Sequence, residues 1–258
     1  MSAPFKSKTD GYSLHGITHL SPSSINSWES NAPLWVAEKL LKKKRPAGAP
    51  IHRGNVVENA VVAVLTGKSL ADAVKAALKE FDKNIIIGDE KTQKERDGIP
   101  AMIEMAVEEL KAYGKPEFSI DGSQKKVSLN CYGDGWTLPV IGYLDLVYPE
   151  HGLVVDLKTT MKMPSKMIAS HRRQRCFYQK AMGNQQVKFL YVTPKKSGWL
   201  TDGDVDEELR ILKRHANRLE RFLRISDDAD YLASIIPVDP NHFYWGDCLE
   251  IRREIFGF

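Results

Sequence analysis

Two apolar runs in the second half of the chain have the length of β-strands. They are Ile141–Tyr148 and Leu153–Lys158, and the four residues Pro149–Gly152 between them are typical of a hairpin loop. In the second run Leu153, Val154, Val155 and Leu157 place apolar side chains on both faces, so the run lacks the alternation of a strand with one face in water. This pattern indicates a central strand that is buried on both faces.

Charged residues interrupt these runs at positions where a buried strand would carry Val or Leu. With a four-residue loop, Tyr148 lies opposite Leu153 and Asp145 lies opposite Asp156. Two ionised carboxylates in opposed positions, about 5 Å apart at Cβ, repel each other, and a divalent cation is the simplest compensation. Strand alternation places Lys158 on the face of Asp156, so one face carries two acids and a base. The alternative is a surface hairpin with solvated charges.

Hydrophobic periodicity elsewhere predicts helices before and after the hairpin. Ser21 is expected to cap a helix that has Pro22 in its first turn. Other helices are expected at 34–43, from 53 onward, and at 71–81, 100–113, 164–182 and 204–224, and further strands at 125–130, 136–148 and 187–192, the first two joined by a turn at 132–135. We therefore predict an α/β fold in which helices flank a central mixed β-sheet with an antiparallel meander.

The chain lacks a linker rich in Pro, Gly or Ser that would divide it into domains. We expect a single domain over residues 1–258, with a core at about 20–193 and a C-terminal helical extension at 204–258. The polar stretch at 89–98 has charges of both signs and is expected to be solvated surface.

The composition is that of an ordinary globular protein, with 42% hydrophobic and 27% charged residues and a net charge of +4. Positive charge is concentrated in Lys42–Arg45 and Arg172–Arg175, which suits a phosphate backbone as partner, although a solvated helix end explains the first run equally well. Arg214, Arg218 and Arg221 are expected on the solvated side of the helix at 204–224.

Cysteines and apolar stretches exclude several classes of protein. Cys131, Cys176 and Cys248 occur singly, without a Cys-x-x-Cys spacing, so neither a disulfide framework nor a zinc site is indicated. No stretch approaches the roughly 20 apolar residues of a membrane span, and the start of the chain lacks the apolar core of a signal peptide. We expect a cytoplasmic protein that does not use a membrane.

The hairpin with its acids and lysine resembles the PD-(D/E)xK nuclease superfamily. Members carry an Asp on one strand and an acid-x-Lys on the next, which match Asp145, Asp156 and Lys158. The resemblance implies a restriction-endonuclease-like core. It also implies that these residues hold magnesium and water against a phosphodiester.

Further residues resemble motifs of the RecB-type and phage recombination exonuclease branch. RecB-type nucleases have a Gly followed four residues later by a metal-binding His, and some phage exonucleases have Glu there; Gly54 and Glu58 match this spacing. The Gln-x-x-x-Tyr signature of the branch matches Gln174 and Tyr178, which an ordinary amphipathic helix face would also explain. The resemblance extends over Leu20–Val192.

The resemblance implies a metal-dependent deoxyribonuclease. Asp145, Asp156 and Glu58, with the main-chain carbonyl of Leu157, would hold one or two Mg²⁺ or Mn²⁺ ions, which prefer oxygen ligands. Lys158 would orient or deprotonate the attacking water.

Substrate binding is expected on the helix after the acid-x-Lys strand. Gln174 and Tyr178, beside Arg172, Arg173 and Arg175, would hold a phosphate or a splayed nucleotide. We favour an exonuclease on linear duplex or single-stranded DNA ends, acting in recombination or repair in a bacterial or phage-infected cell, with a single-strand annealing or recombination protein as a candidate partner. A structure- or sequence-specific endonuclease and a non-catalytic DNA-binding protein are the alternatives.

One departure from the RecB-type pattern concerns iron. Several RecB-type nucleases hold an iron–sulfur cluster with four cysteines, one of them in a Cys-Pro motif. This chain has Ala32 before Pro33 and three cysteines in all. Four thiolates are needed, so no cluster is expected.

Overall fold

The computed structural model describes residues 10–117, 124–129, 137–242, 245–246 and 248–258. Cys131 and the turn expected at 132–135 lie outside these residues. Contacts within the chain define two compact units, which we call the helical unit (residues 1–46, 128–141 and 206–258) and the sheet unit (47–127 and 142–205). In this division the first 46 residues group with residues 206–258, and the single domain with a core at about 20–193 stays a prediction.

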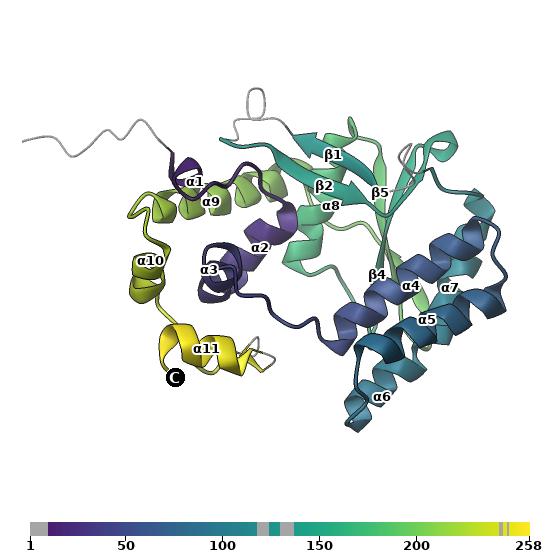
Figure 1. Ribbon diagram of the computed structural model, residues 1–258. Helices are drawn as coiled ribbons and strands as arrows, with labels where there is room; N and C mark the ends of the chain where they lie inside the picture. The colour runs from purple at the N-terminus through teal and green to yellow at the C-terminus, as the bar shows by residue number, and fades with distance from the viewer. Residues whose placement is uncertain (1–9, 118–123, 130–136, 243–244, 247) are drawn as a thin grey trace, which may run out of the picture. The chain divides into compact units, whose positions relative to one another are not determined.

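The sheet unit contains a four-stranded mixed sheet (Figure 1). The strand order is β3–β4–β5–β6, with bounds Leu146–Tyr148, Leu153–Thr159, Gln186–Val192 and Ser197–Leu200. Strands β3 and β4 are antiparallel, β4 and β5 are parallel, and β5 and β6 are antiparallel. The predicted α/β class and the mixed sheet are confirmed.

The predicted hairpin joins β3 to β4. Tyr148 pairs with Leu153, as the four-residue loop required. Pro149–His151 form one 3₁₀ turn (η2), and Gly152 closes the loop with a φ of 56°, in the left-handed region that glycine adopts without a Cβ penalty. Strand β3 begins at Leu146, so the predicted strand at 136–148 is divided at Asp145.

Strands β1 (Lys125–Leu129) and β2 (Val140–Leu144) form a separate two-stranded sheet. Pro139 stands directly before β2, where its missing N–H removes no bond within the strand. The border between the two units passes through both strands.

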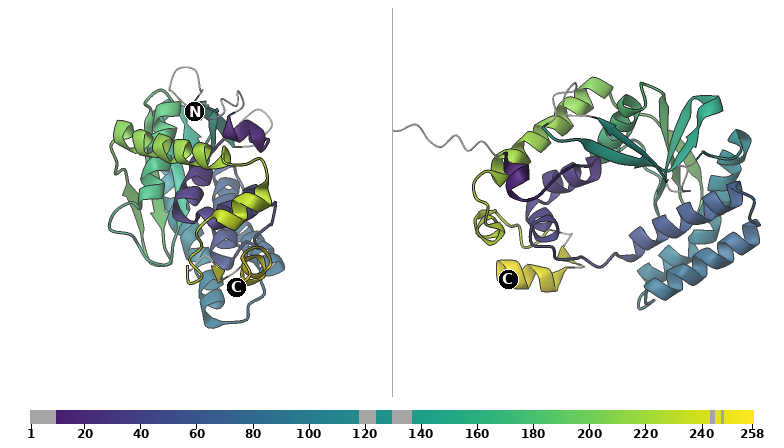
Figure 2. Two further views of the ribbon diagram at one scale, coloured as in Figure 1. Left: turned by 90° about the vertical axis from the view of Figure 1, so that its left-hand side faces the viewer. Right: turned by 45° about the horizontal axis from the view of Figure 1, so that its top comes forward.

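Helices α4 and α7 pack on one face of the four-stranded sheet, and α5 and α6 pack against these two helices (Figure 1). The bounds of α4 to α7 are Ala49–Leu65, Leu70–Asn84, Glu90–Asp97 and Ile99–Leu110, and the 3₁₀ turn η1 (Lys111–Tyr113) follows α7. Val57 of α4 and Met102 of α7 belong to one core cluster with Val155 and Leu157 of β4. Figure 2 shows the same grouping of α4, α5 and α7 from two further directions. Odd-numbered residues of β4 therefore face these helices.

Helix α8 (Ala169–Ala181) covers the other face of the sheet. His171 of α8 lies against the rings of Phe189 and Tyr191 on β5, with ring centroids 5.8 Å apart in both pairs. Because side chains alternate along a strand, Asp156 and Lys158 belong to this face. The helix was expected from residue 164. The main-chain N–H of Met167 instead donates a hydrogen bond to the carboxylate of Asp202, and the helix starts at Ala169.

The helical unit holds the remaining helices. They are α1 (Gly11–Leu14), α2 (Pro22–Ser30), α3 (Ala32–Lys39), α9 (Val205–Leu223), α10 (Ala229–Ile235) and α11 (Leu249–Phe256). The Ser21 hydroxyl accepts a hydrogen bond from the Ser24 N–H, so the predicted cap is confirmed. Helix α3 stops before the predicted residue 43, because Lys42 adopts a left-handed φ of 59°.

The interior of the helical unit contains Trp245, which packs with Leu34, Ala37, Cys248 and Ile251. Within the described part of the chain, none of the helices is long and apolar enough to span a membrane.

Candidate active site

Asp156 and Lys158 form an ion pair on β4, with 2.6 Å between Lys158 Nζ and Asp156 Oδ2. Asp156 is buried, with 1% of its surface exposed, and Lys158 is partly buried. The ammonium also lies 5.1 Å from the ring centroid of Phe189, which pairs with Asp156 from β5. A carboxylate and an aromatic face thus hold Lys158 from two sides.

The carboxylate of Asp145 accepts a hydrogen bond from the main chain of β4. Its Oδ2 accepts a hydrogen bond of 3.1 Å from the N–H of Leu157. Because Leu157 stands between Asp156 and Lys158, this bond brings the acid of the first strand to the acid-x-Lys segment of the second. The carbonyl of Leu157 as a metal ligand stays a prediction.

Gln124 connects the third predicted acid, Glu58, to Asp145. Its Nε2 donates to Glu58 Oε1 at 2.7 Å and to Asp145 Oδ1 at 3.0 Å. Glu58 lies on α4, so the structure brings together residues that are far apart in sequence. Gln124 was not predicted, since a polar residue directly before a strand carries no signal of its own.

The pKa values of all three acids are raised. Burial, followed by the charges of Asp156 and Glu58, raises the pKa of Asp145 well above 3.8. Burial and the charge of Asp156 also raise the pKa of Glu58. For Asp156, burial raises the pKa although Lys158 opposes the shift. With one ammonium beside three acids, the cluster favours any additional positive charge.

The pKa of Lys158 is raised. Burial alone would lower it, but the charges of Asp156, Asp145 and Glu58 outweigh that effect. Lys158 therefore carries its proton in this arrangement and acts as a donor.

The carboxylate oxygens of these three acids are chemically suited to bind a hard divalent cation. Oδ1 of Asp156 is buried, and no hydrogen-bond donor reaches it in the described part of the chain. Carboxylate oxygens are the ligands that Mg²⁺ and Mn²⁺ prefer. The present side-chain positions do not form a finished metal site, because among the described residues no group of three or more His, Cys, Asp or Glu converges as metal ligands. The Gln124 amide donates to Glu58 and Asp145, and the Lys158 ammonium pairs with Asp156.

Gln174 and Tyr178 lie together on α8. Gln174 Nε2 donates to the Tyr178 hydroxyl at 2.9 Å, and Tyr178 is buried. The pKa of the phenol is raised by burial and then by the charges of Asp156 and Asp145, so Tyr178 lies within the field of the acids. Gly142 of β2 makes room for the ring, because a Cβ at this position would stand 2.5 Å from Tyr178 Cε1.

Two of the three arginines of α8 donate hydrogen bonds to main-chain carbonyls of the same unit. Arg175 is buried and donates to the main-chain carbonyls of Asp202 and Gly203, at 3.1 and 2.8 Å. Arg172 donates to the carbonyl of Met167 at 3.0 Å, and Arg173 is buried. Arg175 therefore supports the segment before α9, and substrate contact by Arg175 stays a prediction. Substrate contacts by Arg172 and Arg173 stay predictions.

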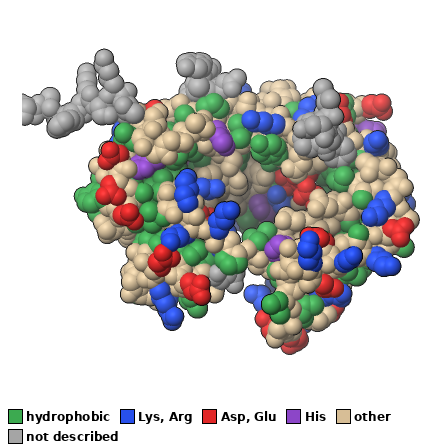
Figure 3. Space-filling model, viewed as in Figure 1, with side chains coloured by type: hydrophobic (Ala, Val, Ile, Leu, Met, Phe, Trp, Pro, Cys, Tyr) green, Lys and Arg blue, Asp and Glu red, His purple; other side chains and the backbone are tan. Residues whose placement is uncertain are grey.

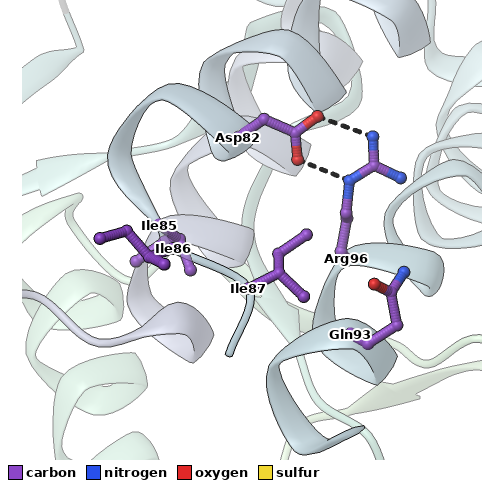
Figure 4. Close-up of a pocket in the computed structure, with 6 residues that line it drawn as sticks. All are labelled: Asp82, Ile85, Ile86, Ile87, Gln93 and Arg96. Carbon is purple, nitrogen blue, oxygen red and sulfur yellow. Dashed lines mark hydrogen bonds and ion pairs between the residues drawn. The ribbon is translucent and has the colours of Figure 1, made fainter. Parts of the chain in front are cut away.

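A separate hollow of about 430 Å³ lies between α5 and α6 (Figure 4). It is lined by Asp82, Ile85, Ile86, Ile87, Gln93 and Arg96. Asp82 and Arg96 close one side with two hydrogen bonds of 2.5 and 2.7 Å. None of these residues belongs to the acid cluster, which consists of Glu58, Asp145 and Asp156.

The space-filling view shows Lys and Arg side chains spread among acidic ones over the face that it presents (Figure 3).

Comparison with known proteins gives no family for this chain. No protein-family model matches it, and no curated protein matches it. Among solved structures, the crystal structure of SSO0001 is similar over 73% of this chain and 84% of that chain, with 14% sequence identity and a TM-score of 0.33. A similarity of this size carries no argument about function.

Proposed function

We propose that this protein is a metal-dependent deoxyribonuclease that hydrolyses phosphodiester bonds, and that it acts as an exonuclease. One observation carries the proposal: Asp156 is buried on a central strand, its Oδ1 lacks a donor among the described residues, and Asp145, Glu58 and Lys158 surround it. Burying a carboxylate oxygen without a partner costs about 1–3 kcal/mol or more. A cation bound at this site would be the missing partner of the oxygen and would offset this cost.

Asp156, Asp145 and Glu58 are the proposed cation ligands, together with the carbonyl of Leu157. The N–H of Leu157 already orients Asp145, and Gln124 orients both Asp145 and Glu58. A bound Mg²⁺ or Mn²⁺ would supply Lewis-acid chemistry, lowering the pKa of a water and neutralising charge on the phosphate.

Lys158 is proposed to donate from its ammonium to the attacking water or to a phosphate oxygen. Its raised pKa favours the protonated form, which supports a role as donor over a role as base. Asp156 and the ring of Phe189 limit its movement, and a preorganised donor stabilises charge that develops in the transition state. Gln174 and Tyr178 are proposed to contact the substrate strand from α8.

The chain order of the sheet unit supports a restriction-endonuclease-like core. The hairpin β3–β4 carries the acids, α8 follows, and β5 then pairs with β4 in parallel. This is the order that the proposed superfamily uses to place an acid-x-Lys strand at the centre of its sheet.

Cleavage of three DNA substrates tests the proposal. Purified protein with Mg²⁺ or Mn²⁺ is added to linear duplex, end-labelled linear duplex and covalently closed circular DNA. We expect nucleotides or short oligonucleotides from the linear substrates, an intact circle, and no reaction in EDTA. Asp156→Asn is the matched control for a contaminating nuclease. A lack of cleavage of all three substrates with either metal would refute the proposal. Cleavage of the circular DNA would show that the enzyme is an endonuclease and not an exonuclease.

A further inference from the structure

The outward face of α9 carries a row of three arginines. Arg214, Arg218 and Arg221 are exposed, at spacings of four and three residues that place them on one side of the helix. The opposite side is buried and includes Leu212 and Leu219. In the described part of the chain, the three guanidiniums have neither an ion pair nor a hydrogen bond.

The ends of the same helix show a different arrangement. Arg210 donates twice to Glu207, at 2.7 and 2.8 Å, and Arg224 pairs with Glu220. Between residues 211 and 223 the only acid of the sequence is Glu220, which is buried and also accepts the N–H of Gly11. Like charges three and four residues apart repel each other, so the row destabilises the isolated helix. A polyanion that binds the row would remove this repulsion.

We propose that Arg214, Arg218 and Arg221 form a binding surface for the phosphate backbone of duplex DNA. They extend over about 10 Å of the helix axis at 1.5 Å per residue, a length comparable to the three steps of about 3.4 Å between four successive phosphates of one strand along the duplex axis. Arginine binds phosphate through two parallel N–H groups and stays charged at all physiological pH values. The identity of the polyanion rests on the proposed function. The surface itself belongs to the helical unit and is separate in sequence from the acid cluster.

The salt dependence of DNA binding tests this surface. The full chain is titrated in EDTA against a labelled linear duplex between about 50 and 300 mM KCl, so that cleavage does not interfere. The test variant is Arg214→Gln/Arg218→Gln/Arg221→Gln. The matched control is Lys68→Gln/Lys75→Gln/Lys79→Gln, which removes the same charge from exposed lysines of the sheet unit. Thermal unfolding of each variant checks that it is folded.

The arginine variant should bind at least about tenfold more weakly at 0.1 M salt, and its slope of log K against log salt should fall in magnitude by about 2–3, since each phosphate contact contributes about 0.9. The control should change the slope by less than about one, and the triple Arg→Lys variant should retain it. Equal effects of the arginine and lysine variants, or no effect of either, would overturn the proposal. If the wild-type protein did not cleave DNA with Mg²⁺ but these binding differences were observed, the proposed nuclease activity would be refuted and the proposed DNA-binding surface would stand.

Discussion

Arg53 of α4 donates from Nη2 to the main-chain carbonyl of Thr159, with 3.1 Å between the two atoms. Its Nε also donates to the Thr159 hydroxyl at 3.2 Å, and its Nη1 forms an ion pair with Glu95 of α6. Thr159 directly follows Lys158, and Arg53 stands five residues before Glu58. One buried guanidinium therefore joins the helix of one proposed ligand to the strand of the proposed catalytic lysine.

Replacing Arg53 by Met should destabilise the protein by about 3–5 kcal/mol, because Glu95 would remain buried without its cation. Urea unfolding in the absence of metal measures this difference. The double variant Arg53→Met/Glu95→Leu should recover most of the loss, since it removes both charges. A loss below about 1 kcal/mol in the single variant would contradict a buried, paired role for Arg53.

The stability of the metal-free protein should fall as pH rises above the ordinary Asp pKa of 3.8. Burial, with Asp156 and Glu58, raises the pKa of folded Asp145, so the folded state holds a proton that the unfolded state has released. Stability is then fully present below 3.8 and is lost as pH rises through the raised folded pKa.

Asp145→Asn isolates this effect. At neutral pH the metal-free variant should be as stable as wild type or more stable, because one member of the repelling set is gone. The difference in Tm between variant and wild type should therefore grow from about pH 4 to about pH 8. A difference that stays constant over this range would argue against a raised pKa at Asp145. Magnesium affinity, measured by calorimetry, should fall in the variant.

Gly142→Ala should disturb the ring of Tyr178. The added Cβ would lie 2.5 Å from Tyr178 Cε1 and 2.9 Å from Phe177 Cε1, so both rings must shift. We expect a loss of about 1–3 kcal/mol in the free energy of unfolding, together with slower DNA cleavage. Gly88→Ala is the control, because no atom lies within 4 Å of the Cβ that it adds. Equal stability of the two variants would show that the space beside Gly142 is unimportant.

The local sequence pattern was sufficient to predict the hairpin and the positions of its acidic residues. The turn residues before Gly152 and the apolar runs on either side fixed the pairing of Tyr148 with Leu153, and alternation placed Lys158 beside Asp156. The position of Glu58 near the other acids came from a family resemblance, since nothing in local sequence reports which helix packs beside a given strand.

Long-range contacts explain what the sequence did not reveal. The polar stretch at 89–98 was expected to be solvated, but it contains α6, whose Glu95 is buried against Arg53. Strand β6 was missed because its Trp199 and Ser197 are held by Glu109 of α7, a contact between residues about 90 positions apart. Gln124 belongs to no periodic pattern, and only the folded chain shows that it joins two acids.

Single-turnover cleavage by Lys158→Ala tests the central claim most directly. The variant and wild type are mixed in excess with an end-labelled linear duplex and Mg²⁺, and Mg²⁺ and DNA affinities are measured for both. Lys166→Ala, which removes an exposed lysine, is the control. Because Lys158 is proposed to act on charge that exists only in the transition state, the variant should cleave about 10²–10³ times more slowly while both affinities stay within a few-fold of wild type. Cleavage by Lys158→Ala within a few-fold of the wild-type rate would contradict the account.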